Sequence, residues 1–224
     1  MSSRYPALAL IGDIHGRFSA LTAVLGAVRG LGITDGLCTG DVVMRGPDPG
    51  RCIAQLRALG WPTVVGNTDQ KVAAGHPRPP EHPASSRTGS RSWSYRRLHQ
   101  EDLAWLKSLP LVVRVTFEGA RVVMTHGHPE TLSPAISADT TDRELERQLR
   151  AFDADVLVVG HTHEAMARSV RNGIVINPGA VGESRGPDWQ PHWAWIEARP
   201  DGITAHLEVV SDPLAPQRDD TPED

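Results

Sequence analysis

The chain has little cysteine, no long apolar run and no excess of positive charge. Cys38 and Cys52 are the two cysteines among 224 residues, so they form no disulfide framework and we expect a reduced, cytoplasmic setting. No apolar stretch approaches the roughly 18 residues that cross a bilayer. We expect the N-terminal residues, MSSRYPALALIGD, to form a strand and not a signal peptide. The net charge of -4 gives no overall basic field, so we expect neither nucleic acid nor an anionic membrane as a partner.

The remaining composition is that of an ordinary globular protein. Apolar residues make up 39% and charged residues 22%, and a chain of this length can bury a sizeable core. We expect one domain over residues 1–211 and a disordered acidic tail over residues 212–224. Because no basic groove is indicated, we interpret the tryptophans as packing residues and not as a platform for nucleic-acid bases.

Apolar periodicity in the first third of the chain predicts alternating strands and helices. Short apolar runs that end in glycine are typical of buried strands, and apolar residues spaced by three and four are typical of amphipathic helices. The predicted order is strand, helix, strand, helix, strand, over residues 7–11, 18–30, 37–41, 51–59 and 63–65. This order predicts neighbouring parallel strands joined by right-handed crossovers.

The rest of the chain predicts a long loop followed by helices and hairpins. Residues 75–92 are rich in Pro, Ser, Arg and His and are predicted to form an exposed loop. We interpret the arginine-rich segment 87–97 as solvated, with a cap over a substrate phosphate as the alternative. Helices are predicted over residues 101–109 and 142–152, a buried strand over 155–159, and hairpin turns at 118–120, 172–173 and 200–202.

Five short polar clusters, each following an apolar run, supply side chains that bind metal ions. The clusters are GDIHG, GDVV, GNTD, THGH and GHTH. Their carboxylate, amide and imidazole donors belong to Asp13, His15, Asp41, Asn67, His126, His161 and His163. Ligands of layered α/β proteins gather at the carboxyl ends of strands, so we expect these donors to meet at one rim. Asp13 and His15 are expected to bind one ion together, because residues two apart in an extended segment point the same way; the same holds for His161 and His163 if their segment is extended.

The donor set is sufficient for two divalent cations. Asp41 has two carboxylate oxygens and is the candidate bridge, since two-metal hydrolases hold their ions roughly 3.5–4 Å apart. Asn67 would contribute a neutral amide oxygen, which leaves the ions Lewis-acidic. A water shared by the two ions would be a hydroxide near neutral pH, because metal coordination brings its pKa to about 7.

The ordered pattern D-x-H, GD, GN, H and G-H-x-H resembles that of the calcineurin-like metallophosphoesterases. The strings WSYRRLHQEDLAWLKSLP, VVMTHGHP and INPGAVG resemble the small bacterial phosphodiesterase branch of that family. The resemblance implies an α/β fold, a four-layer sandwich of two mixed β-sheets flanked by helices. It also implies a dinuclear centre of manganese first, with iron, zinc or nickel as alternatives. The first ion is then held by Asp13, His15, Asp41 and His163, and the second by Asp41, Asn67, His126 and His161.

Two positions bear on what the centre would do. Many family members have a histidine after the Asn of the GN motif that protonates the leaving group, whereas this chain has Thr68, which is no general acid near pH 7. His128 or His76 is the candidate replacement. Arg45 stands where some relatives have a phosphate-binding arginine, with an exposed surface role as the alternative. We therefore expect catalytic roles for Asp41, Asn67 and His128, and substrate binding by Arg45 and His128. The remaining histidines are interpreted as surface or core residues, namely His82, His99, His192 and His206.

These residues predict a metal-dependent phosphodiesterase in which a metal-bridging hydroxide attacks the phosphoryl centre. The expected partner is a small phosphoester, with nucleotides among the candidates; the oligomeric state is left open. Alternatives within enzymes are a phosphomonoesterase or protein phosphatase and a dinucleoside-polyphosphate hydrolase. A non-catalytic binding scaffold is the rival of another class, since a retromer subunit resembles this fold and works through protein contacts.

Overall fold

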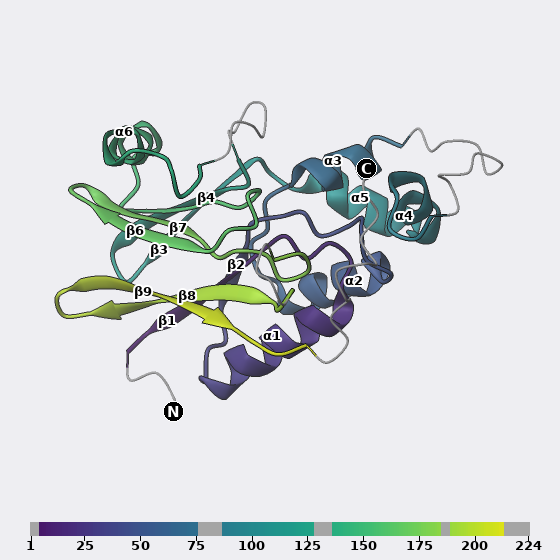
Figure 1. The fold of residues 1–224 in the computed structure, drawn as a ribbon, viewed down its shortest axis with the longest axis horizontal. Coiled ribbons are helices and arrows are strands. Elements are labelled where there is room, and N and C mark those ends of the chain that lie inside the picture. Colours follow the sequence, from purple (N-terminus) through teal and green to yellow (C-terminus); the bar gives the residue numbers. More distant parts are fainter. Residues whose placement is uncertain (1–4, 76–86, 128–135, 185–188, 213–224) are drawn as a thin grey trace.

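Two β-sheets pack face to face between helices in the computed structural model of the chain, which describes residues 5–75, 87–127, 136–184 and 189–212 (Figure 1). The first sheet has the strand order β2-β1-β8-β9. Its strands are β1 (Ala7–Ile11), β2 (Gly36–Cys38), β8 (His192–Arg199) and β9 (Gly202–Val209). β1 runs parallel to β2 and antiparallel to β8, so this sheet is mixed.

The second sheet has the strand order β3-β4-β5-β7-β6 and is also mixed. Its strands are β3 (Val112–Phe117), β4 (Ala120–Thr125), β5 (Val156–Val158), β6 (Met166–Val170) and β7 (Gly173–Asn177). β4, β5 and β7 are parallel neighbours, and the outer strands pair with them as antiparallel hairpins. The loops after β4 and β5 therefore leave the sheet at the same edge.

Helices cover the outer faces of both sheets. α1 (Phe18–Gly30) and α2 (Pro49–Leu59) lie against the first sheet, whereas α6 (Asp142–Phe152) lies against the second (Figure 1). Three shorter helices pack on one another beside α2, namely α3 (Asn67–Ala73), α4 (Arg91–Arg97) and α5 (Gln100–Ser108). No helix in the described part of the chain is long and apolar enough to cross a membrane.

Strand periodicity distributes the core over three interfaces. In β1, Leu8 and Leu10 point between the sheets, while Ala9 and Ile11 pack with the residues of α1 and α2. In β7 the same alternation directs Val175 towards α6 and its neighbours towards the first sheet. Because successive strand residues point to opposite faces, apolar runs without polar alternation give strands that are buried on both sides. The predicted four-layer sandwich of two mixed sheets flanked by helices is confirmed.

Several predicted elements agree with the structure, and two do not. The helix over 142–152 and the three hairpins are present. The predicted strand over 63–65 is wrong, because this segment makes only an isolated bridge between Thr63 and Cys38, and the N–H of Val65 bonds to Pro110. The antiparallel strand β8 takes the place beside β1. The interpretation of segment 87–97 as a solvated loop is also wrong in part, because the segment contains α4, in which Ser92 and Ser94 are buried. Residues 213–224 of the predicted tail lie outside the described residues.

Candidate metal centre

The seven predicted donors all lie where strands end at one edge of the sandwich. Asp13 and His15 follow β1, and Asp41 follows β2. Asn67 begins α3, after the segment that bridges to β2. From the second sheet, His126 follows β4, and the loop after β5 carries His161 and His163. The structure brings these side chains together in two groups that share Asp41.

The first group consists of Asp13, His15, Asp41 and His163. One ligand atom from each lies within 4.8 Å of the others. His163 Nε2 is 3.1 Å from His15 Nε2 and 3.3 Å from Asp13 Oδ1. His15 Nε2 is 3.8 Å from Asp41 Oδ2. Two carboxylates and two imidazoles that converge in this way form a donor set suited to a divalent cation.

The second group consists of Asp41, Asn67, His126 and His161. Asn67 Oδ1 lies 2.8 Å from His161 Nδ1 and 3.1 Å from His126 Nε2. The two imidazole nitrogens are 3.3 Å apart, and His126 Nε2 is 3.6 Å from Asp41 Oδ1. This arrangement again directs a carboxylate oxygen, an amide oxygen and two imidazole nitrogens at one point.

Asp41 connects the groups with its two oxygens. Oδ2 faces His15 in the first group, and Oδ1 faces His126 in the second. The N–H of Thr68 donates to Oδ1 at 2.8 Å, which fixes the orientation of the carboxylate. Asp41 therefore directs one carboxylate oxygen at each group of donors.

Five of the seven donors have left-handed backbone conformations. The φ angles are positive at Asp13 (49°), His15 (51°), Asp41 (50°), His161 (76°) and His163 (61°). Residues other than glycine adopt this region at a cost of about 1–3 kcal/mol, and they do so chiefly at functional sites. Asp13 and His15 lie together in the first group as expected, but a turn and not extended backbone brings them there. The segment of His161 and His163 is not extended either, and its turn sends His161 to the second group and His163 to the first.

Asp69 holds two of the donor loops together. Its Oδ1 accepts hydrogen bonds from the N–H groups of Val42 (2.8 Å) and Val43 (3.1 Å), and its Oδ2 accepts one from Gly66 (3.0 Å). The side chain is fully buried. The loop after β2 is thereby tied to the start of α3. No role was predicted for Asp69 from the sequence. An acidic residue in the first turn of a helix commonly accepts hydrogen bonds from backbone N–H groups there, and Asp69 lies in the first turn of α3.

Asn177 plays the corresponding part for the histidine loop after β5. Its Nδ2 donates to the carbonyl of Gly160 (3.0 Å) and to Thr162 Oγ1 (2.9 Å), and its Oδ1 accepts from the N–H of Gly179 (2.9 Å). The residue is fully buried. The string INPGAVG, which contains Asn177, contributes to the family resemblance, but no role was expected for Asn177.

The electrostatics of the first group suit a cation. Burial by itself raises the pKa of Asp13, but the hydrogen bond and charge of His163 outweigh it and lower that pKa to about 2. Burial lowers the pKa of His15 to about 4, against the opposing charge of Asp41. Near neutral pH, Asp13 is therefore ionised and His15 is neutral. Asp13 and His15 thus have the protonation states that metal ligands require. Burial lowers the pKa of His163, but the hydrogen bond and charge of Asp13 outweigh burial and raise that pKa, so His163 must give up any proton before it binds an ion.

The other predicted site residues have different outcomes. Arg45 pairs through Nη1 with Glu183, whose side chain is 12% exposed and which sequence reasoning did not identify. Thr68 is buried, and its hydroxyl donates to the carbonyl of Val43 at 3.0 Å. Its proton is therefore not directed at a leaving group. His128 and His76 lie outside the described residues.

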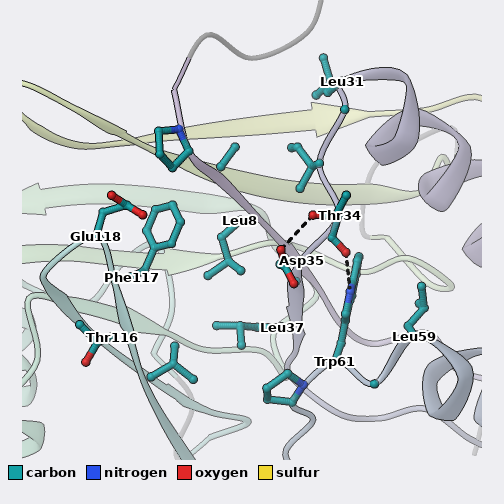
Figure 2. A pocket seen from close by; sticks show the side chains of 18 of the residues that line it. Leu8, Leu31, Thr34, Asp35, Leu37, Leu59, Trp61, Thr116, Phe117 and Glu118 are labelled. Atoms are coloured by element: carbon teal, nitrogen blue, oxygen red, sulfur yellow. Dashed lines mark hydrogen bonds between the residues drawn. The ribbon is translucent and has the colours of Figure 1, made fainter.

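A large pocket lies away from these donors (Figure 2). Its volume is about 590 Å³, and it lies where β1 and β2 begin, whereas the donors follow the ends of those strands. Leu8, Leu37, Trp61 and Phe117 contribute apolar walls. The described residues that line it include carboxylates but no basic side chain, so the pocket is poorly suited to a phosphate group.

Comparisons with known proteins agree with this geometry. A family model described as the calcineurin-like phosphoesterase superfamily domain matches residues 7–199. An uncharacterized protein of Methanocaldococcus jannaschii is 28% identical over 197 residues, which cover 80% of this chain and 77% of that protein. The crystal structure of a metallophosphoesterase from Sphaerobacter thermophilus is 28% identical with a TM-score of 0.72, covering 95% of this chain and 91% of that chain. A symmetrical bis(5'-nucleosyl)-tetraphosphatase of Erwinia tasmaniensis is 31% identical over 147 residues, 62% of this chain and 51% of that protein.

Proposed function

Because the chain belongs to the calcineurin-like phosphoesterase superfamily, we propose that it is a phosphoester hydrolase that uses two divalent ions and acts on phosphodiesters. The placement of Asp41 carries this proposal. One of its oxygens faces each group of donors, so one carboxylate serves both positions. A scaffold that works through protein contacts would not need donors for two ions.

Each donor has a proposed place. The first ion is assigned to Asp13, His15, Asp41 and His163, and the second to Asp41, Asn67, His126 and His161. Ions held by these residues would supply Lewis acidity towards a phosphoryl group and would lower the pKa of bound water to about 7. Manganese is the first candidate and iron, zinc or nickel the alternatives, because imidazole with carboxylate donors suits all four.

The surrounding residues favour substrates with good leaving groups. Thr68 donates its hydroxyl to a backbone carbonyl and is buried, so it supplies no proton to a departing alkoxide. Arg45 stays partly exposed beside the first group and presents a planar guanidinium, which suits two oxygens of one phosphoryl group. His128 remains the candidate acid.

Substitution of the shared carboxylate tests the proposal. Asp41→Asn and His161→Ala are each expected to lose the second ion and the hydrolysis of bis-p-nitrophenyl phosphate in the presence of manganese. Asp35→Asn is the matched control, because Asp35 is exposed at the opposite end of β2. Metal content is measured independently by elemental analysis. Full turnover by either site variant with unchanged metal content would refute the proposal, and a blank for metal-loaded wild type would favour a scaffold.

A second candidate is hydrolysis of dinucleoside polyphosphates. The observation in its favour is Arg45 beside the first group, together with the similarity to a protein named as a bis(5'-nucleosyl)-tetraphosphatase, of which this chain spans about half. Relative rates on a diester, a monoester and a diadenosine polyphosphate separate the three activities. A preference of at least tenfold for the polyphosphate would replace the diester assignment.

A further inference from the structure

Glu183 lies against the first group of donors without belonging to it. Its Oε2 is 3.6 Å from His163 Nδ1 and 4.0 Å from His15 Nε2, and it also forms an ion pair with Nη1 of Arg45. The carboxylate is mostly buried, with 12% of the side chain exposed. One carboxylate oxygen thus contacts the residue proposed to anchor phosphate and faces two proposed metal ligands.

The backbone leaves Glu183 little freedom to move. The N–H of Val181 donates to the carbonyl of Gly12 at 3.0 Å, and the N–H of Gly182 donates to the carbonyl of Asp13 at 2.9 Å. A Cβ on Gly182 would lie 1.9 Å from the carbonyl oxygen of Ile14, so only glycine permits this approach. Glu183 follows directly and is therefore fixed relative to the loop that carries Asp13.

The ring of His163 has one nitrogen available for such a partner. Its Nε2 faces Asp13 Oδ1 at 3.3 Å, which leaves Nδ1 directed at Glu183. Metal-binding histidines commonly donate their second ring N–H to a carboxylate or carbonyl, which fixes the ring. His126 follows this pattern, because its Nδ1 lies 2.8 Å from the carbonyl of Thr39. The 3.6 Å separation at Glu183 is an ion-pair distance, slightly longer than a hydrogen bond.

We propose that Glu183 is a positioning residue that couples the first metal position to Arg45. It orients His163 through Nδ1, and it holds the guanidinium of Arg45 beside the same group of donors. Its negative charge also offsets the positive charge of Arg45, which would otherwise oppose a cation at that position. This inference rests on the proposed function and adds to it a residue that links metal affinity with substrate affinity.

Metal affinity tests the first half of the inference. Manganese is titrated into metal-free wild type, Glu183→Ala and Glu183→Gln, with calorimetry and electron paramagnetic resonance as readouts. Loss of a partner to a metal-binding histidine typically weakens metal binding about 10–100-fold, so Glu183→Ala is expected to lose that much for one of two ions. Glu183→Gln is expected to recover part of the loss, because its amide oxygen still faces Nδ1. Glu146→Ala, on the surface of α6, is the control.

The outcomes separate this inference from the function on which it rests. Wild-type affinity for both ions in Glu183→Ala would overturn the inference while leaving the hydrolase assignment intact. A wild type that binds no manganese would overturn the hydrolase assignment itself. A lower melting temperature of Glu183→Ala, with unchanged affinity for both ions, would show that Glu183 only stabilises the fold. That result would also overturn the inference.

Substrate affinity tests the second half. Arg45→Ala is expected to retain both ions and to raise KM for the diester more than it lowers kcat. Glu183→Ala, assayed at saturating manganese, is expected to raise KM as well. The double variant is expected to show no further rise in KM beyond Arg45→Ala, because Glu183 reaches the substrate only through Arg45. Independent, multiplying effects on KM would show that the two residues act separately.

Discussion

A methyl group added at Gly66 is expected to displace the shared carboxylate. An ideal Cβ at Gly66 would lie 2.0 Å from Asp41 Oδ1 and 2.2 Å from the backbone nitrogen of Asp41, whereas real Cβ contacts essentially never fall below 3.0 Å. Asp41 must therefore retreat by about 1 Å, a displacement that can cost on the order of 10²-fold in rate at a site that requires precise geometry. Gly66 has a φ of -92°, so alanine fits the backbone and the effect is one of contact alone.

Gly66→Ala is compared with Gly26→Ala in three measurements: turnover of bis-p-nitrophenyl phosphate, bound manganese and thermal midpoint. Overpacking at Gly66 is expected to cost about 1–3 kcal/mol of stability as well as one ion. A Cβ at Gly26, in the exposed interior turn of α1, meets nothing within 4 Å. Replacement of glycine by alanine in a helix stabilises it by roughly 0.5–1 kcal/mol, so this control is expected to melt slightly higher with full activity.

The result that would refute this reasoning is a folded Gly66→Ala variant that binds two ions and turns over within about twofold of wild type. The site would then tolerate a shift of the Asp41 carboxylate. The close approach of Gly66 to Asp41 would not be needed for ion binding or turnover. A variant that fails to fold is distinguished by its circular dichroism. In that case refolding of Gly66→Ala in saturating manganese provides the second measurement, with the same expected loss of one ion.

Three further predictions follow from burial and charge. Asp69→Asn keeps one acceptor oxygen but turns an NH₂ group towards a buried backbone N–H. The free energy of unfolding, measured with urea, is therefore expected to fall by roughly 1–3 kcal/mol. An unchanged urea midpoint would contradict this prediction. Burial raises the pKa of Cys38 to about 12 and also raises the pKa of Cys52, so neither thiol is expected to react with Ellman's reagent until the protein unfolds, and rapid labelling of the native protein would show that the sites open. Manganese at 100 times its Kd is expected to stabilise the folded protein by about 2.7 kcal/mol per site. For a chain of this length that raises the melting temperature by roughly 5–10 °C. Equal melting temperatures in chelator and in manganese would argue against a metal centre.

Local signals explain which parts of the molecule could be predicted. The helix over Asp142–Phe152 has an N-capping Thr141 and strong apolar periodicity, and the hairpins turn at Gly-containing pairs, so a few neighbouring residues determine each element. The donors could be found for a similar reason. Each lies directly after an apolar run, and parallel neighbours bring the ends of such runs to one edge.

Features that depend on distant segments could not be predicted. Glu183 lies beside His163 because the chain after β7 bonds to Gly12 and Asp13, which are far away in the sequence. The segment 63–65 has strand-like residues and Val64 bonds to Cys38 of β2, yet the next N–H on that side, that of Gly66, donates to Asp69 and so does not continue the ladder. The alternation rule failed at Asp13 and His15 for a local reason, because both residues have positive φ and a turn takes the place of extended backbone there.

The centre joins the two sheets, and this explains why the sandwich is needed for it. Asp13, His15 and Asp41 follow strands of the first sheet, whereas His163 comes from the second. The second group divides in the same way, with Asp41 and Asn67 on one side and two histidines on the other. His126 Nδ1 also bonds across to the carbonyl of Thr39 at 2.8 Å. Neither sheet alone offers a full set of the proposed ligands, so any change that slides one sheet past the other would alter both proposed ion positions at once. We therefore expect ion binding to be coupled to the packing of Leu10, Met124 and Val158 between the sheets, because each would stabilise the register that the other requires.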